Sequence, residues 1–464
     1  MSASRRTSML AVSAVVVVAM SLVSCASITS LSPTQSPGSR LPTPRATSIP
    51  TAFVPPASLA PFATPVVRPT ATGEAVVPPP IDQFGTPVQG TTTYGAPDWV
   101  KVGTRMTYYG AAATVVQSGY TYVEDPEGEW EDPKTGKRYH RTDQGDNPED
   151  MPSAAGEAYT QTDVLAVEPG KVVLSTTMYP IDLMTRGFGI NPLGGYNGQS
   201  AAVDGAWVHP SLLQDLVTSG YDDQLILRGP YTLGGKVYDT VSFLYRGPGS
   251  WQDSTYDGAT GALLATNTRV EGNPSPVHGP FDDPQGNVQL SYTRLAGVRN
   301  VIVPGLGAPV PGWVAPSSTL TYSGSATVVN PMDPSAVFSW PVQATVTFGE
   351  VGATWATFTS HSVVDYGGYQ QPTDSAGTTG STGVYWYDPS SLATMQTGQV
   401  LDQDPITGAS VTVDSADGGA VSLLTEMNGA SLRLGYDSAS GALVTMETTN
   451  STTGITLQLQ LTQG

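Results

Sequence analysis

The stretch Tyr256-Asp257-Gly258-Ala259-Thr260-Gly261-Ala262-Leu263-Leu264 returns near the end of the chain as Tyr436-Asp437-Ser438-Ala439-Ser440-Gly441-Ala442-Leu443-Val444. The two stretches are identical at six of their nine positions. A second copy of so long a motif indicates that the chain repeats a whole folding unit. The turn residues inside the motif and the apolar residues after it are typical of a tight turn that leads into a β-strand.

Further matches extend outward from this pair in the same order along the chain, which indicates two copies of one unit. They are Trp99-Val100 with Trp313-Val314, Thr107-Tyr108-Tyr109-Gly110 with Thr321-Tyr322-Ser323-Gly324, and Trp207-Val208-His209-Pro210-Ser211 with Trp386-Tyr387-Asp388-Pro389-Ser390. The first copy carries an insertion near residues 117–150. We therefore expect a first β-domain over residues 96–297 and a second over residues 298–464.

Within each copy apolar and polar residues alternate with a period of two, the pattern of strands with one buried face. Examples are Val241 and Phe243 in the first copy, and Leu432 and Leu434 in the second. Glycine, proline and aspartate separate these runs at short intervals, which favours antiparallel strands. We predict a mainly β protein, a tandem repeat of two antiparallel β-domains. Each would be a curved sheet or half-barrel with one short helix.

Four segments share the formula Asp-x-x-Ser/Thr-Gly: Asp132–Gly136, Asp257–Gly261, Asp404–Gly408 and Asp437–Gly441. Aspartate can accept hydrogen bonds from the backbone just ahead, and glycine can take the positive φ that returns the chain to a strand. We interpret all four as hairpin tips rather than as metal sites, because each supplies only one carboxylate.

The helical segments are expected where proline follows each Trp-x-x motif, over 210–218 and 389–397. Leu212, Leu213, Leu216 and Val217 form an apolar stripe at helical spacing in the first of them. The stripe predicts a helix that packs on the sheet or plugs an open barrel. A lid over a ligand cavity is the alternative.

The first residues have the features of an export signal, with Arg5-Arg6 ahead of the apolar stretch 9–23. Leu22-Val23-Ser24-Cys25 follows, and Cys25 is the only cysteine of the chain. This segment resembles the lipobox of bacterial lipoproteins. The resemblance implies a signal peptide over residues 1–24, lipidation of Cys25 with acyl chains such as palmitate, and a membrane anchor in the bacterial cell envelope that faces outside the cytoplasm. An ordinary signal peptide or an uncleaved anchor is the alternative.

Residues 25–95 are rich in proline, serine and threonine and have no sustained hydrophobic period. Such a composition cannot bury enough apolar surface to order itself. We predict a disordered tether, which would span roughly 45 Å as a flexible coil.

The chain carries a net charge of −19, which repels phosphate backbones, so a nucleic-acid partner is not expected. The four histidines lie in separate segments without zinc-ligand spacing, and we find no catalytic nucleophile motif and no phosphate-binding loop. No cofactor, no zinc site and no catalysis are expected. An extracellular hydrolase that uses a carboxylate pair is the remaining enzyme hypothesis.

The insertion is acidic and aromatic, with ten acidic residues between Glu124 and Asp150. The simplest interpretation is a solvated hairpin whose charges protect a sheet edge. The functional alternatives are a calcium site or a surface that binds a basic partner or a glycan. The candidate residues are Asp125, Glu127, Glu129, Trp130, Glu131 and Asp132.

A second resemblance lies at Asp204-Gly205-Ala206-Trp207 and Tyr385-Trp386-Tyr387-Asp388-Pro389. Both segments resemble the Asp-Gly…Trp…Tyr-Asp-Pro strand of LolA/LppX-like lipoprotein carriers. This implies a curved antiparallel sheet that closes over helices and holds acyl chains. The pattern is split between the copies, with His209 in place of the aspartate in the first.

The leading functional hypothesis is a tethered, non-catalytic lipoprotein that carries a lipid or another apolar ligand. Its cavity would be lined by inward residues such as Val241, Phe243, Leu432 and Leu434. An adhesion or scaffold module that binds protein or glycan through the acidic loop is the alternative, and the identity of the ligand or partner stays open.

Overall fold

The computed structural model describes residues 94–117, 121–124, 126–127, 130–131, 137–142, 152–181, 187–194, 201–220, 224–247, 250–271, 286–329, 337–450 and 455–464. The predicted signal peptide and all of the predicted tether except Tyr94 and Gly95 lie outside these residues. Among the described residues, no helix has the length and the apolar character needed to cross a membrane.

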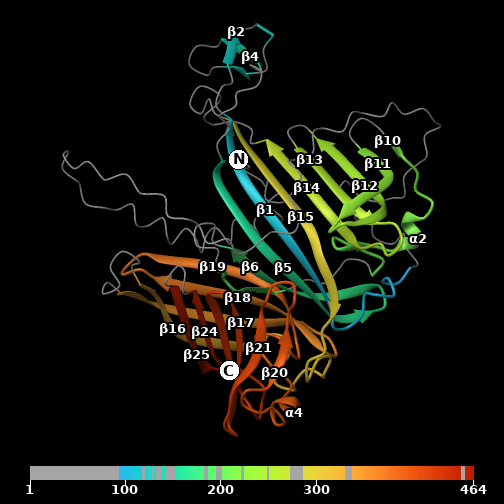
Figure 1. Ribbon diagram of the computed structural model, residues 1–464. Coiled ribbons are helices and arrows are strands. Elements are labelled where there is room, and N and C mark those ends of the chain that lie inside the picture. The colour runs from blue at the N-terminus through green and yellow to red at the C-terminus, as the bar shows by residue number, and fades with distance from the viewer. Residues whose placement is uncertain are drawn as a thin grey trace, which may run out of the picture. The chain divides into compact units, whose positions relative to one another are not determined.

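The first large sheet has ten strands in the order β10-β11-β12-β13-β14-β15-β1-β5-β6-β7, drawn in cyan to yellow in Figure 1. They are β1 (Thr104–Gln117), β5 (Pro152–Glu168), β6 (Lys171–Ile181), β7 (Asn191–Gly194), β10 (Ser219–Gly220), β11 (Gln224–Leu233), β12 (Lys236–Gly247), β13 (Ser250–Asp257), β14 (Leu263–Glu271) and β15 (Gly286–Asn300). Two small sheets accompany it, β2 (Thr121–Glu124) with β4 (Arg138–Thr142) and β3 (Trp130–Glu131), and β8 (Val203–Asp204) with β9 (Trp207–Val208). The helix α2 (Pro210–Leu213) follows β9.

The second large sheet has ten strands in the order β19-β18-β17-β16-β25-β24-β23-β22-β21-β20. They are β16 (Thr319–Val329), β17 (Val337–Val351), β18 (Trp355–Asp365), β19 (Gln370–Gly380), β20 (Val400–Gln403), β21 (Ser410–Ala416), β22 (Ala420–Met427), β23 (Ala430–Asp437), β24 (Leu443–Asn450) and β25 (Ile455–Gln463). The helix α4 (Pro389–Leu392) lies between β19 and β20.

The two strand orders correspond one to one. In each sheet the first long strand of the copy, β1 or β16, lies between the last strand of that copy and the next long strand. The predicted fold class is confirmed, because the described residues form two ten-stranded antiparallel sheets in tandem with very few helical residues.

The chain divides by its contacts into two units. Pro230–Tyr238 belong to the smaller unit, and all other described residues belong to the larger one. The described part of the smaller unit is a hairpin tip. Gly234 and Gly235 take positive φ there, and the Lys236 Nζ atom lies 4.3 Å from the ring centroid of Tyr238.

Each copy has its own hydrophobic core on one face of its sheet, which we call the inner face. Met106, Tyr108 and Val241 contribute to the first core, and Tyr322 and Val421 occupy the corresponding places in the second. A fully buried tryptophan lies in each core, Trp207 in the first and Trp386 in the second. Burial of such large rings is a major source of stability.

The repeated motif, at residues 256–264 and 436–444, forms a turn that docks on the segment before the helix in each copy. In the second copy the Trp313 Nε1 atom donates a hydrogen bond to the Ser440 carbonyl oxygen at 2.8 Å, and the Tyr387 nitrogen donates to the Gly441 carbonyl oxygen at 2.9 Å. In the first copy the Trp99 indole donates to the Thr260 carbonyl oxygen, also at 2.8 Å. The matching tryptophans therefore fasten the start of each copy to its docked turn.

Three of the four predicted hairpin tips are confirmed. Asp257–Gly261 joins β13 to β14, Asp404–Gly408 joins β20 to β21, and Asp437–Gly441 joins β23 to β24. In each turn the glycine nitrogen donates a hydrogen bond to the aspartate carbonyl oxygen. Asp132–Gly136 lies outside the described residues.

The helices are shorter than predicted, because only 210–213 and 389–392 are α-helical. The chain turns away from each helix after one turn, and Leu213 and Leu392 are the helical residues that reach the cores. Asp388 caps α4 by accepting from the Ser391 nitrogen at 2.9 Å, whereas His209 caps α2 through Nδ1 at 3.2 Å from the Ser211 nitrogen. Burial lowers the pKa of His209, which favours the neutral ring that this cap needs.

The two copies contact each other within the larger unit. Tyr109, Tyr159 and Tyr179 lie on the outer face of the first sheet, opposite to its core, and pack against Leu432 and Met427 of the second copy. Burial in this cluster raises the pKa of Tyr179 to about 12. The inner face of the second sheet thus packs in part on its own core and in part on the outer face of the first sheet.

A partly buried polar network lies beside this cluster and joins the copies. The Arg105 Nε atom lies 2.6 Å from Asp163 of its own copy, and its Nη1 atom lies 2.9 Å from Asp402 of the second copy. Arg299 donates two hydrogen bonds to Asp402, at 2.8 and 2.7 Å. Burial alone would raise the pKa of Asp402, but the hydrogen bond from Arg299 and the charge of Arg105 hold it below its ordinary value.

The turn Asp404–Gly408 completes the contact. Asp404 is only 1% exposed, and its carboxylate accepts a hydrogen bond from the Gln161 side chain of the first copy. The Ile406 side chain lies against Gly297, where a Cβ atom would be 2.6 Å from its Cδ1 atom. This hairpin tip is therefore a structural contact between the copies.

The docked turns predict a difference between two glycines of the second copy. We expect Gly441→Ala to lower the free energy of unfolding by at least about 2 kcal/mol, since left-handed backbone costs a residue with a Cβ atom roughly 1–2 kcal/mol. The new Cβ atom would also lie 2.1 Å from the Tyr387 carbonyl oxygen. Urea unfolding measures the loss.

Gly408→Ala is the matched control, because Gly408 has nearly the same φ of +77° but nothing within 4 Å of the new atom. It is expected to cost only about 1 kcal/mol. Equal losses in the two variants would contradict the role assigned to the docked turn.

Candidate functional site

The acidic insertion contributes only a few described side chains. Glu124, on β2, forms an ion pair with the Lys137 Nζ atom at 2.7 Å, and Glu127 is exposed. Trp130 and Glu131 form β3, paired with Tyr139 and Arg138 of β4, while Asp125, Glu129 and Asp132 lie outside the described residues. Within the described part of the chain, no group of three or more His, Cys, Asp or Glu residues could hold a metal ion. Binding through this loop stays a prediction.

The four residues predicted to line a cavity are distributed over different clusters. Val241 is fully buried in the first core with Phe243 packed against it. Leu432 belongs to the cluster between the copies, and Leu434 contacts both that cluster and the second core. The structure therefore brings them together as two pairs, one in each copy.

The inner face of the second sheet carries apolar side chains beyond its core. Two rows cross β17, β16 and β25 there, and we call their six residues the inner apolar strip. One row is Trp340, Ala326 and Leu457, and the next is Phe338, Val328 and Ile455. The strip is partly open to solvent, and Phe338 is 52% exposed.

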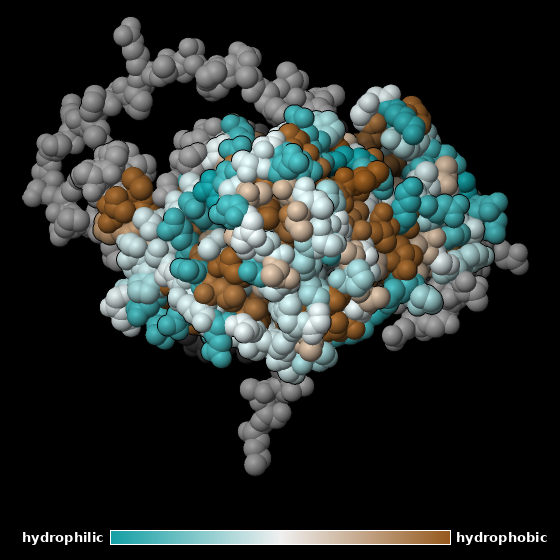
Figure 2. All heavy atoms as spheres, turned by 90° about the horizontal axis from the view of Figure 1, so that it is seen from below, coloured by the Kyte–Doolittle hydropathy of each residue, from teal (hydrophilic) through white to brown (hydrophobic). Residues whose placement is uncertain are grey.

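Aromatic rings continue the strip toward the β18–β19 hairpin. The ring centroids of Phe338 and Trp340 are 6.0 Å apart, those of Trp340 and Tyr366 are 5.1 Å apart, and Tyr369 follows at 6.4 Å from Tyr366. Tyr369 is 68% exposed. On the face drawn in Figure 2, hydrophobic residues also gather in several patches between hydrophilic ones, so apolar surface is present outside the cores.

The first copy has small or polar residues where the second has the strip. Gly156, Ala112 and Ser291 correspond to Trp340, Ala326 and Leu457, and Ala154, Thr114 and Gln289 correspond to Phe338, Val328 and Ile455. The shared architecture does not require large apolar residues at these places. Large exposed apolar patches mark interaction sites more often than chance surface.

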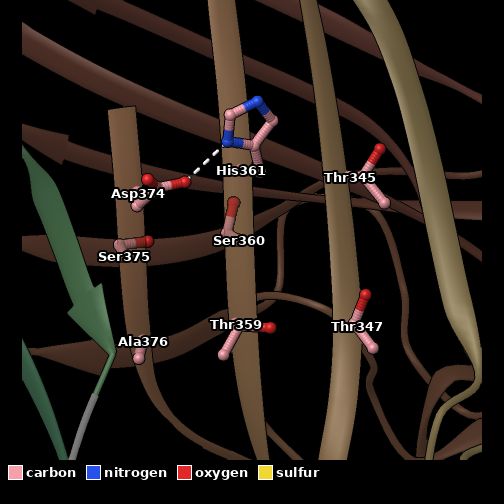
Figure 3. Close-up of a pocket in the computed structure, with 8 residues that line it drawn as sticks. All are labelled: Thr345, Thr347, Thr359, Ser360, His361, Asp374, Ser375 and Ala376. Atoms are coloured by element: carbon pink, nitrogen blue, oxygen red, sulfur yellow. Dashed lines mark hydrogen bonds and ion pairs between the residues drawn. The ribbon is translucent and has the colours of Figure 1, made fainter. Parts of the chain in front are cut away.

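A hollow of about 470 Å³ lies elsewhere on the second sheet, across β17, β18 and β19 (Figure 3). It is lined by Thr345, Thr347, Thr359, Ser360, His361, Asp374, Ser375 and Ala376. The His361 Nδ1 atom lies 2.6 Å from the Asp374 Oδ1 atom, and the two side chains point toward each other from neighbouring strands in Figure 3.

A third group lies on the outer face of the first sheet. Asn267 donates a hydrogen bond to Asp253 at 3.2 Å, and Arg294 donates to Asn267 at 2.7 Å. Burial raises the pKa of Asp253, although the hydrogen bonds from Asn267 and Thr255 oppose the rise. These side chains bind one another across three strands and leave a single carboxylate, so they offer no carboxylate pair for hydrolysis.

Features shared by the two copies do not reveal the aromatic residues Phe338, Trp340, Tyr366 and Tyr369. Comparison of the two copies position by position would have revealed Trp340 and Phe338, which replace a glycine and an alanine. The hollow carries no short motif in the sequence, since its side chains come from three strands.

No family model and no curated protein matches the sequence. Among solved structures, the chain is similar to MucB from the crystal structure of MucB in complex with MucA(peri), with 10% identity, a TM-score of 0.15, and coverage of 76% of this chain and 88% of that one. It is also similar to a double mutant of the vaccine antigen Transferrin Binding Protein B (TbpB) from Haemophilus parasuis Hp5, with 8% identity, a TM-score of 0.11, and coverage of 79% and 78%. At these TM-scores neither likeness bears on what this chain does.

Proposed function

We propose that this protein is a lipid-anchored, extracytoplasmic binding protein that holds an apolar ligand, such as a lipid, on the inner apolar strip. The observation that carries the proposal is the strip itself: at five of its six positions a larger apolar residue, in one case more than half exposed, stands where the first copy has a small or polar one. The proposed role is non-catalytic. Binding on such a surface is driven by the burial of apolar area and requires no reacting group.

The geometry of the strip suits a flexible apolar chain. Its two rows lie side by side across three strands, and the row of rings from Phe338 through Trp340 and Tyr366 to Tyr369 continues it. A bound chain would cover these side chains and remove them from water. Each Å² of apolar surface so buried contributes roughly 25 cal/mol before the cost of association is subtracted.

The proposed anchor rests on the sequence. Cys25 is the only cysteine and follows Leu22-Val23-Ser24, in the manner of a lipobox. The tether of residues 25–95 would hold the β-domains within roughly 45 Å of the membrane as a flexible coil. A lipid bilayer at this distance is a source of the proposed ligand.

We expect the double variant Phe338→Ala with Leu457→Ser, which introduces the residues of the first copy, to weaken the binding of an apolar fluorescent probe by about tenfold or more. The reason is the loss of roughly 1.5 kcal/mol or more of contact with the two side chains. Titration of the full-length protein with 1-N-phenylnaphthylamine measures the affinity, and native mass spectrometry shows co-purified lipid.

Val400→Ser is the matched control, since Val400 is 61% exposed on β20 and lies outside the strip. It is expected to leave probe binding unchanged. Equal affinity of the double variant and the wild type, or a wild type that binds neither probe nor lipid, would reject the apolar site.

The anchor is tested separately by Cys25→Ala in bacterial cells. We expect the wild type to sediment with membranes after a high-salt wash, and the variant to lose most of this association, because stable anchoring needs more than one acyl chain or a spanning helix. Fractionation followed by immunoblotting measures the distribution. A variant that stays in the membrane pellet like the wild type would indicate that the apolar stretch 9–23 is an uncleaved anchor instead.

A further inference from the structure

The hollow of Figure 3 corresponds to a surface of the first sheet that is already occupied. In the first sheet, Gln161 and Asp163 of β5 lie under the second copy's hairpin tip Asp404–Gly408 and its neighbour Asp402. The registers β1–β5 and β16–β17 place Thr345 and Thr347 at the positions of Gln161 and Asp163. The same two residues line the hollow, which extends from them across β18 to β19.

A second copy of this chain does not fit the hollow. The first sheet receives its neighbour on Tyr109, Tyr159, Tyr179 and Ile181, which form an apolar cluster with it. The corresponding residues of the second sheet are Ser323, Gln343, Val363 and Asp365. Three of these four residues are polar, so this surface is unsuited to an apolar interface of the kind that the first sheet forms, and a smaller, more polar contact fits it better.

The charges of the two sites also differ, because Thr347 stands at the position of Asp163. In the first sheet Arg105 and Arg299 face the carboxylates of the docked hairpin. Thr319 stands at the position of Arg105, and the hollow instead carries the Asp374 carboxylate, which is 81% exposed. The chain as a whole has a net charge of −19, which attracts cationic partners and repels anionic ones.

We propose that the hollow is a docking site for a lysine- or arginine-bearing β-turn of another protein. Asp374, aligned by its contact with His361, pairs with the cation of the turn. The hydroxyl groups of Thr345, Thr347 and Thr359 donate hydrogen bonds to the backbone carbonyl groups that a turn exposes. The site lies apart from the inner apolar strip, so this interaction is independent of the proposed ligand.

The test is a titration of the full-length protein with a cyclised β-hairpin peptide whose turn carries two lysines. A peptide with two aspartates at the same places is the control probe. Calorimetry at low ionic strength is expected to give at least about tenfold tighter binding of the lysine hairpin. Asp374→Lys is expected to remove this preference by like-charge repulsion, and the exposed position of Asp374 on an edge strand keeps the fold intact.

Glu426→Lys makes the same charge change on an exposed residue of β22 in the same sheet, far along the strand order. It is expected to keep at least half of the wild-type affinity for the lysine hairpin. Equal binding of the two hairpins, no binding of either one, or equal losses in the Asp374 and Glu426 variants would overturn the proposal. The last result would mean that the hairpin responds to the net charge alone.

Discussion

The rest of the structure depends on the largely buried contact of Arg105 and Arg299 with Asp402 and Asp404, which joins the two copies. A buried ion pair contributes little net stability, because desolvation offsets most of its attraction, but removal of one partner is costly. Such a contact therefore specifies one arrangement of the two copies more than it adds to the free energy of unfolding. The tyrosine cluster beside it supplies apolar burial, and the network sets which turn of the second copy meets which strand of the first.

The contact explains why two copies with one architecture have different surfaces. The outer face of the first sheet is aromatic and basic because it receives the second copy, whereas the same face of the second sheet is polar and hollowed. The inner face of the second sheet is apolar both where it covers Tyr109 and Tyr159 and beyond, at Phe338 and Trp340. The two copies share one scaffold, and among the described residues the cluster between the copies includes neither the inner apolar strip nor the lining of the hollow.

The sequence predicted what local chemistry and duplication determine. The Asp-x-x-Ser/Thr-Gly turns and the matching tryptophans indicated hairpins and two copies, because their hydrogen bonds are short-range or recur in both copies. The contact between the copies could not be predicted, since Arg105 and Asp402 are far apart in the sequence and neither lies in a motif. The helices were predicted too long because the apolar stripe after Pro210 continues past the point where the chain turns toward β10.

The central claim is that the two sheets form one unit held by this network, and Asp402→Ala tests it most directly in the full-length chain. Hydrogen exchange followed by mass spectrometry reports the opening of β1, β5 and β20 separately. The account predicts that the variant lowers protection in strands of both copies, by up to about 3 kcal/mol, because two partly buried arginines lose their shared partner. A loss confined to the β20–β21 hairpin, with β1 and β5 unchanged, would contradict it.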